Sequence, residues 1–115
     1  MCGRYMNVDT ELRDVAIPPD VQGILVPRYN ISPNQLAPIV ALDAEGRRAA
    51  RAHHWGLAPA WAAPKMQRPI NARAEGVRTN GMFRGAFAKR RCLVPAGGFY
   101  EWQKSGTRRC RSSSA

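Results

Sequence analysis

The chain has 115 residues, a net charge of +10 and a hydrophobic fraction of 44%. This length suffices for one domain, and the apolar fraction excludes a wholly disordered chain. The sequence contains neither an apolar run of about 18 residues nor a signal-peptide pattern, so we expect a cytoplasmic protein without a membrane partner.

The positive charge is concentrated in the second half of the chain. Residues 1–50 carry five basic and six acidic side chains, whereas residues 51–102 carry nine basic and two acidic ones. Residues 103–115 add four basic side chains and no acid. This surplus favours a polyanionic partner, because cations that neutralise phosphates release counterions. A basic surface that is merely solvated has the same composition, so charge alone leaves both interpretations open.

Three cysteines, Cys2, Cys92 and Cys110, lie far apart in the sequence. Their odd number and the expected cytoplasmic location argue against a disulfide framework. Together with His53 and His54 they offer possible zinc ligands, but the chain has no C-x-x-C or H-x-x-x-H pair. We therefore expect no metal site and no cofactor.

The first half of the chain predicts one short helix and a hairpin. Residues 9–16 favour a helix, with a capping side chain at the start and two prolines beyond the end. The apolar run 37–42 predicts a strand, "DAEGRR" a hairpin turn, and residues 49–57 the returning strand.

The second half predicts a loop, a helix and two short strands. Three prolines in residues 58–69 indicate a surface loop, on which Trp61 would be exposed for stacking. Residues 70–76 predict a short strand or turn, residues 82–91 a helix with a basic end, and residues 92–102 two short strands. The fold class that we predict is therefore α+β and mainly β.

The apolar pattern stops after Trp102, and residues 105–115 have the composition of a basic, Ser/Arg-rich disordered tail. We therefore predict a domain over residues 1–104 and a separate tail over residues 105–115.

Cys2 is the first candidate for covalent chemistry. Its side chain is small enough for Met1 to be removed, which would leave an α-amine and a thiol on one residue, both partly nucleophilic near neutral pH. The amine can condense with an aldehyde to an imine, and the thiolate can then close a thiazolidine ring. Alternatively, the thiolate can attack an acyl group with the amine as its base. A small residue without a role, near a chain end, fits the position equally well.

Two further groups of polar residues are candidates. Asn71, Arg73 and Glu75 would share one face of an extended segment, where they could position a phosphate or a carbonyl, or simply face solvent. Glu101 lies between aromatic residues in "FYEW", and a carboxylate in apolar surroundings is suited to proton transfer. A solvent-facing glutamate on an edge strand fits the same pattern.

Six segments, in this order, resemble the SRAP family, the abasic-site processing proteins: "MCGRY", "YNISPNQLAPIV", "WGLAPAW", "INARAEG", "MFRGAF" and "RCLVPAGGFYEW". The resemblance extends from Cys2 to about Lys104. It implies a protein that senses abasic sites in single-stranded DNA during the DNA damage (SOS) response, acting on nucleoid DNA.

The resemblance also implies roles for individual residues. Cys2 matches the residue that forms a thiazolidine cross-link with the opened abasic sugar after autocatalytic removal of Met1. Asn71 matches an asparagine that orients the N-terminus, and Glu101 a glutamate that transfers protons. The positions that match DNA contacts are Arg4 and Arg73, to phosphate, and Trp61, Met82 and Phe83, by stacking or wedging.

The family fold is longer than this chain, and its later half supplies further strands and a catalytic histidine that neither His53 nor His54 matches. We therefore expect a partial barrel-like sheet with short helices, the second half of the fold missing, and a monomer. Peptidase (hydrolase) and lyase activity stay open on this basis. The alternatives are a non-catalytic basic fragment that binds single-stranded DNA, and an N-terminal-cysteine glutamine amidotransferase, which the downstream motifs do not resemble.

Overall fold

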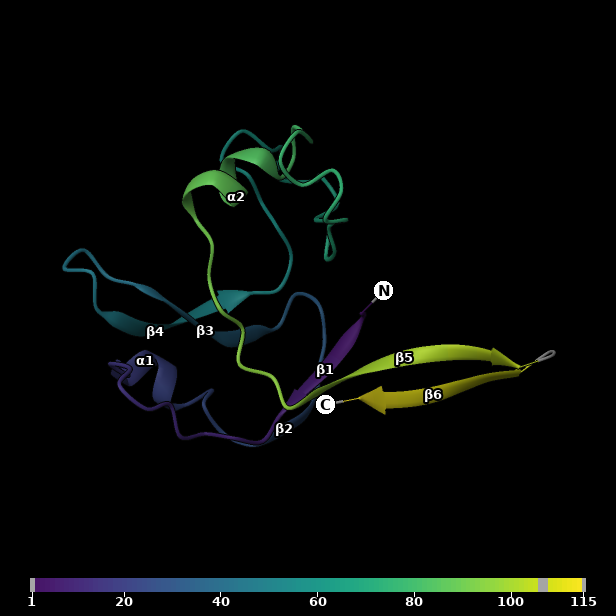
Figure 1. The fold of residues 1–115 in the computed structure, drawn as a ribbon, viewed down its shortest axis with the longest axis horizontal. Helices are drawn as coiled ribbons and strands as arrows, with labels where there is room; N and C mark the ends of the chain where they lie inside the picture. The colour runs from purple at the N-terminus through teal and green to yellow at the C-terminus, as the bar shows by residue number, and fades with distance from the viewer. Residues whose placement is uncertain (1, 106–107, 115) are drawn as a thin grey trace.

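The computed structural model describes the backbone of residues 2–105 and 108–114, and the side chains of residues 2–101. Short strands predominate in this part of the chain, with two short helices, so the predicted α+β, mainly β class is confirmed (Figure 1). The elements are β1 (Arg4–Asn7), α1 (Pro19–Gln22), β2 (Arg28–Ile31), β3 (Leu36–Leu42), β4 (Arg48–His54), α2 (Arg84–Lys89), β5 (Gly98–Ser105) and β6 (Arg108–Ser114).

The described strands form two antiparallel sheets that do not close into a barrel. The larger sheet has the order β2-β1-β5-β6, and β3 and β4 form a separate hairpin. Val40 of β3 also exchanges two backbone hydrogen bonds with Leu93, at N–O distances of 2.8 and 2.9 Å. Residues 58–91, which we call the upper lobe, carry α2 and lie above the sheets in Figure 1.

A small core joins the larger sheet to the hairpin. Tyr5 of β1, Ile31 of β2 and Ala37 of β3 are buried, with Cys2 and Trp55 packed against them. The rings of Tyr5 and Trp55 meet edge to face with their centres 5.5 Å apart, a favoured arrangement for aromatic pairs. Burial raises the pKa of the Tyr5 phenol. This core fixes the N-terminal strand against the residue that follows β4.

Several elements predicted from the sequence are confirmed. The hairpin strands appear as β3 and β4, the turn between them lies within residues 43–47, and the predicted helix near residues 82–91 appears as the shorter α2. The proline-rich segment 58–69 contains no strand or helix, as expected. Strands β1 and β2 were not predicted, because each has only four residues and weak apolar alternation.

The helix predicted over residues 9–16 is wrong. Asp9 Oδ1 accepts the backbone N–H of Glu11 at 3.0 Å, and such a local bond competes with helical hydrogen bonding. Asp14 has a φ of 57°, which is incompatible with a right-handed helix. The helix α1 instead begins at Pro19, because proline is well suited to the first helical turn, where its missing N–H costs nothing.

Residues 70–76, predicted as a short strand or turn, form no strand and end in a turn, in which the N–H of Gly76 donates to the carbonyl oxygen of Arg73 at 3.2 Å. Of the two strands predicted within residues 92–102, the second appears as part of β5, whereas the first is reduced to a bridge at Leu93. In the predicted tail, the backbone of Arg108–Ser114 pairs with β5 as β6. Ladder hydrogen bonds join backbone groups, so a polar composition does not prevent them. The boundary at residue 104 stays a prediction. No helix within the described residues is long and apolar enough to span a membrane.

The β3–β4 turn yields a test with a defined pH dependence. Asp43 Oδ1 accepts the N–H of Arg47 at 2.8 Å and of Glu45 at 3.0 Å, and the bond from Arg47 is the main cause that holds the pKa of Asp43 below its ordinary value of 3.8. A lowered folded-state pKa adds stability that is present above pH 3.8 and disappears as the pH falls through the folded pKa. Asp43→Ala should therefore lower Tm at pH 7, and the difference from the parent should shrink below pH 3.8 in thermal melts.

Glu45→Ala is the matched control, because Glu45 contributes only an exposed carboxylate 3.6 Å from Arg47 and should affect Tm little. A Tm difference for Asp43→Ala that stays constant with pH would contradict this account of the turn.

Candidate functional site

Cys2 lies two residues before β1, half-buried against the core. Its thiol donates to the carbonyl oxygen of Arg4 at 3.3 Å. Its own carbonyl oxygen accepts a hydrogen bond from Asn71 Nδ2 at 2.7 Å, across 69 residues of sequence. Asn71 therefore fixes the backbone of Cys2, and the structure brings together two of the three residues predicted to be catalytic.

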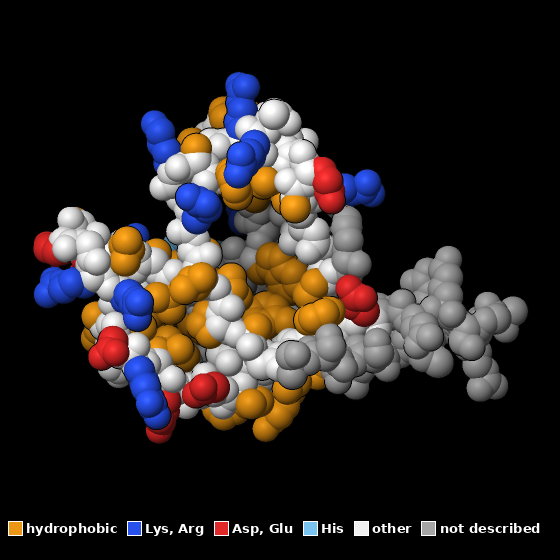
Figure 2. All heavy atoms as spheres, in the orientation of Figure 1, with side chains coloured by type: hydrophobic (Ala, Val, Ile, Leu, Met, Phe, Trp, Pro, Cys, Tyr) orange, Lys and Arg blue, Asp and Glu red, His pale blue; other side chains and the backbone are white. Residues whose placement is uncertain are grey.

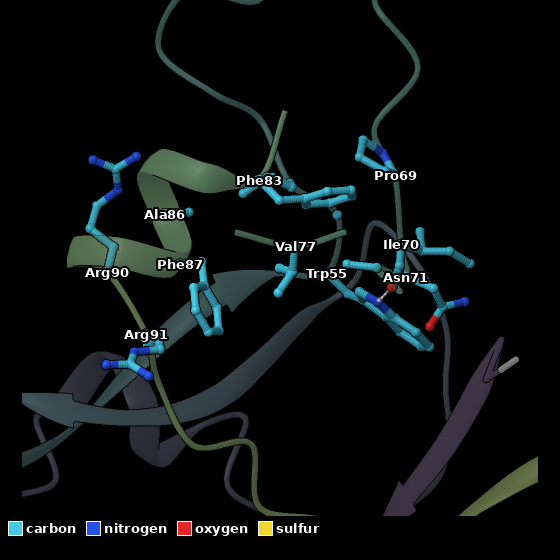
Figure 3. A pocket seen from close by; sticks show the side chains of 13 residues that line it. Trp55, Pro69, Ile70, Asn71, Val77, Phe83, Ala86, Phe87, Arg90 and Arg91 are labelled. Atoms are coloured by element: carbon cyan, nitrogen blue, oxygen red, sulfur yellow. Dashed lines mark hydrogen bonds between the residues drawn. The ribbon is translucent and has the colours of Figure 1, made fainter. Parts of the chain in front are cut away.

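Asn71 is itself held in place through Trp55. The indole N–H of Trp55 donates to the carbonyl oxygen of Ile70 at 2.9 Å (Figure 3). The backbone N–H of Leu57 donates to the carbonyl oxygen of Pro69 at 3.0 Å. Because Trp55 also packs on Tyr5, the segment 69–71 is anchored to the same core that holds β1. Sequence reasoning missed this role of Trp55, since a tryptophan after a strand carries no signal for such a bond.

Gly56 allows the chain to leave β4 and pass close to the returning segment. Its φ of 134° lies in a region that L side chains rarely adopt. A Cβ at this position would also lie 3.2 Å from the Cβ of Arg68. The backbone conformation therefore favours glycine here, and any larger residue would also have to displace Arg68.

Asn71 and Phe83 line each of three hollows that meet around them. The first extends along α2 (Figure 3), the second is lined also by Arg73 and Glu75, and the third also by Met82. In Figure 2, hydrophobic side chains gather where the upper lobe meets the sheets. Three of the predicted DNA contacts, Arg73, Met82 and Phe83, thus lie around Asn71.

Asn80 sets the start of α2 beside these hollows. Its side-chain oxygen accepts the N–H of Met82 at 2.8 Å, and its backbone oxygen accepts the N–H groups of Phe83 and Arg84. The Asn80–Gly81 pair is a turn signal by which this position can be recognised in the sequence.

The other predicted site residues lie outside these hollows. Arg4 is exposed, and its Nη1 donates to Asn30 Oδ1 at 3.0 Å. Trp61 is 64% exposed in the proline-rich loop, as expected for a stacking side chain. Glu101 is exposed on β5, and the register Arg4↔Tyr100 places it at the end of the sheet where Cys2 lies.

Within the described residues, no group of three or more His, Cys, Asp or Glu side chains is placed to hold a metal ion. Cys92 is exposed as a residue, yet partial burial of its sulfur raises the pKa of the thiol, which keeps it protonated and poorly nucleophilic near neutral pH. The side chain of Cys110 falls outside the described residues.

Gly56→Ala tests whether the stability of the fold depends on glycine at this position. We expect a loss of about 1 to 3 kcal/mol in the free energy of unfolding, because alanine would be strained at this φ and would crowd Arg68. Gly23→Ala is the control, since Gly23 has a φ of −67° and open space around its Cα. Urea unfolding measures both; equal effects would contradict the account.

The comparisons with known proteins agree with this architecture. The Abasic site processing protein YoaM of Bacillus subtilis is 32% identical over 111 residues, which cover 90% of this chain and 48% of that protein. The Abasic site processing protein HMCES of Gallus gallus is 34% identical over 98 residues, which cover 74% of this chain and 29% of that protein. This chain thus spans half or less of the length of these relatives.

A crystal structure of a protein from Bordetella bronchiseptica shares the fold, with a TM-score of 0.71 at 22% identity over 96% of this chain and 55% of that one. The family model described as SOS response associated peptidase (SRAP) matches residues 1–112. This match confirms the resemblance found in the sequence motifs: the chain belongs to the SRAP family.

Proposed function

We propose that this protein processes abasic sites in single-stranded DNA by forming a covalent thiazolidine link through Cys2. The observation that carries the proposal is the 2.7 Å hydrogen bond from Asn71 to the carbonyl oxygen of Cys2, which holds the N-terminal residue beside the hollows of the upper lobe. The names of the relatives, as abasic site processing proteins, support the same substrate.

The chemistry begins with removal of Met1, which frees the α-amine of Cys2. The amine nitrogen attacks the aldehyde carbon of the opened sugar, and loss of water gives an imine. The Cys2 sulfur then bonds to the imine carbon as the thiol proton passes to the nitrogen, which closes the thiazolidine ring. Holding the Cys2 carbonyl orients the Cα that carries the α-amine and, through Cβ, the thiol, and such orientation accelerates ring closure.

Proton transfer is assigned to Glu101. Loss of water from the carbinolamine needs an acid, and hydrolysis of the Met1 peptide bond needs a base that activates water. Glu101 lies at the same end of the sheet as Cys2, one residue beyond the pair Arg4↔Tyr100. Its exposure keeps the carboxylate accessible to a bound strand and to water.

The DNA contacts combine cations with flat or apolar side chains. Arg4 and Arg73 are exposed and serve the phosphates. Trp61 stacks on a base, and Met82 and Phe83 enter the strand beside Asn71. Binding of this type does not depend on base sequence. It therefore suits a cytoplasmic protein of the DNA damage response, which must act wherever a base has been lost.

The central test mixes the purified protein with single-stranded DNA that contains one abasic site. We expect an adduct that survives heating in SDS and that is lost in Cys2→Ala but retained in Cys92→Ala, the matched thiol control. If the parent protein binds this DNA in a salt-sensitive way but forms no adduct, the protein is a non-covalent single-strand-binding protein and the proposal is wrong.

Asn71→Ala should slow adduct formation about 10- to 100-fold at saturating DNA, because the N-terminal residue loses its orienting bond. Asn71→Asp, which keeps the shape but places an oxygen where the N–H group was, should behave like the alanine variant. Single-turnover rates measure the effect. Parent-like rate constants in both variants would remove Asn71 from the site.

A further inference from the structure

The ring of Phe87, on α2, is surrounded by positive charge. The guanidinium carbon of Arg91 lies 5.0 Å from the ring centre, and that of Arg78 lies 5.9 Å from it. Guanidinium groups at such distances are attracted by the electrons of the ring face. One aromatic side chain therefore gathers two cations from segments on either side of α2.

The charge around Phe87 is not balanced by acidic side chains. Residues 72–91 carry six basic side chains and one acidic one, and all six cations are exposed. Figure 2 shows Lys and Arg side chains distributed over the upper lobe. The lobe thus presents cations that are available to an anionic partner.

These cations adjoin the candidate site. Phe87, Arg90 and Arg91 line the same hollow as Asn71. In Figure 3, Phe87 points down from α2 into this hollow, with Arg91 on one side and Val77, Ile70 and Asn71 on the other. A polymer that enters beside Asn71 can therefore continue along the hollow to the arginines without leaving the surface.

We propose that Arg78 and Arg91, positioned by the Phe87 ring, bind the phosphate backbone of the DNA strand at nucleotides that flank the abasic one. This inference rests on the proposed function, which places the strand at Cys2. It adds a second contact between protein and DNA, so the affinity for DNA depends on the nucleotides that flank the abasic site. Phosphate suits this place because a guanidinium can donate two parallel hydrogen bonds to it. An apolar polypeptide in the same hollow would leave these cations without a partner.

The experiment measures binding of the full chain to oligothymidine of about 15 nucleotides without an abasic site, over a series of salt concentrations. Each phosphate contact on a single strand contributes about 0.7 to the slope of log K against log salt. Arg91→Gln should reduce this slope by about 0.7, and the double variant with Arg78→Gln by about 1.4. Arg13→Gln is the matched control: it removes one exposed charge from the segment before α1 and should leave the slope unchanged.

Phe87→Leu separates positioning from charge. Leucine keeps apolar bulk on α2 and removes no charge, yet it should reduce the slope as the arginine variants do, because the guanidinium groups lose their common ring. Slopes for Arg91→Gln and Phe87→Leu equal to that of Arg13→Gln would overturn the inference. Since this DNA has no aldehyde, the result is independent of whether the protein forms a cross-link.

Discussion

One hydrogen bond, from Asn71 Nδ2 to the carbonyl oxygen of Cys2, connects the reactive end of the chain to the rest of the site. A single bond of this kind contributes only about 1 kcal/mol, too little to order a chain terminus by itself. Its effect depends on the earlier immobilisation of both partners. Cys2 is carried by a strand between two neighbours, and Asn71 follows a carbonyl that is bound by the indole of Trp55.

The small aromatic core thus has a larger role than its size suggests. Tyr5 and Trp55 pack edge to face, and each also belongs to a segment that reaches the site: β1 on one side and the anchor of residues 69–71 on the other. The sheets and the upper lobe therefore have different roles. The sheets fix the position of the reacting residue, while the upper lobe supplies the cations and apolar side chains that suit a nucleic acid strand.

Local patterns predicted the elements that depend on local sequence. The apolar run before "DAEGRR" predicted the hairpin, and the segment 82–91 predicted the helix that appears as the shorter α2. Strands β1 and β2 escaped prediction because long-range pairing, such as Tyr5 with Ile31, stabilises them rather than their own composition. The family resemblance implied that Asn71 orients the N-terminus, whereas no spacing rule could show that residues 69 positions apart would meet. The pairing of Arg78 and Arg91 at one ring was hidden for the same reason.

Mapping the covalent bond by mass spectrometry tests the central claim most directly. The protein is incubated with single-stranded DNA containing an abasic site, treated with nuclease and protease, and its N-terminal peptide is analysed. The account predicts that this peptide has lost Met1 and carries the sugar remnant on Cys2, with both the amine and the thiol blocked. A remnant attached to a lysine or to Cys92, or an N-terminal peptide that retains Met1 and carries no sugar, would contradict it.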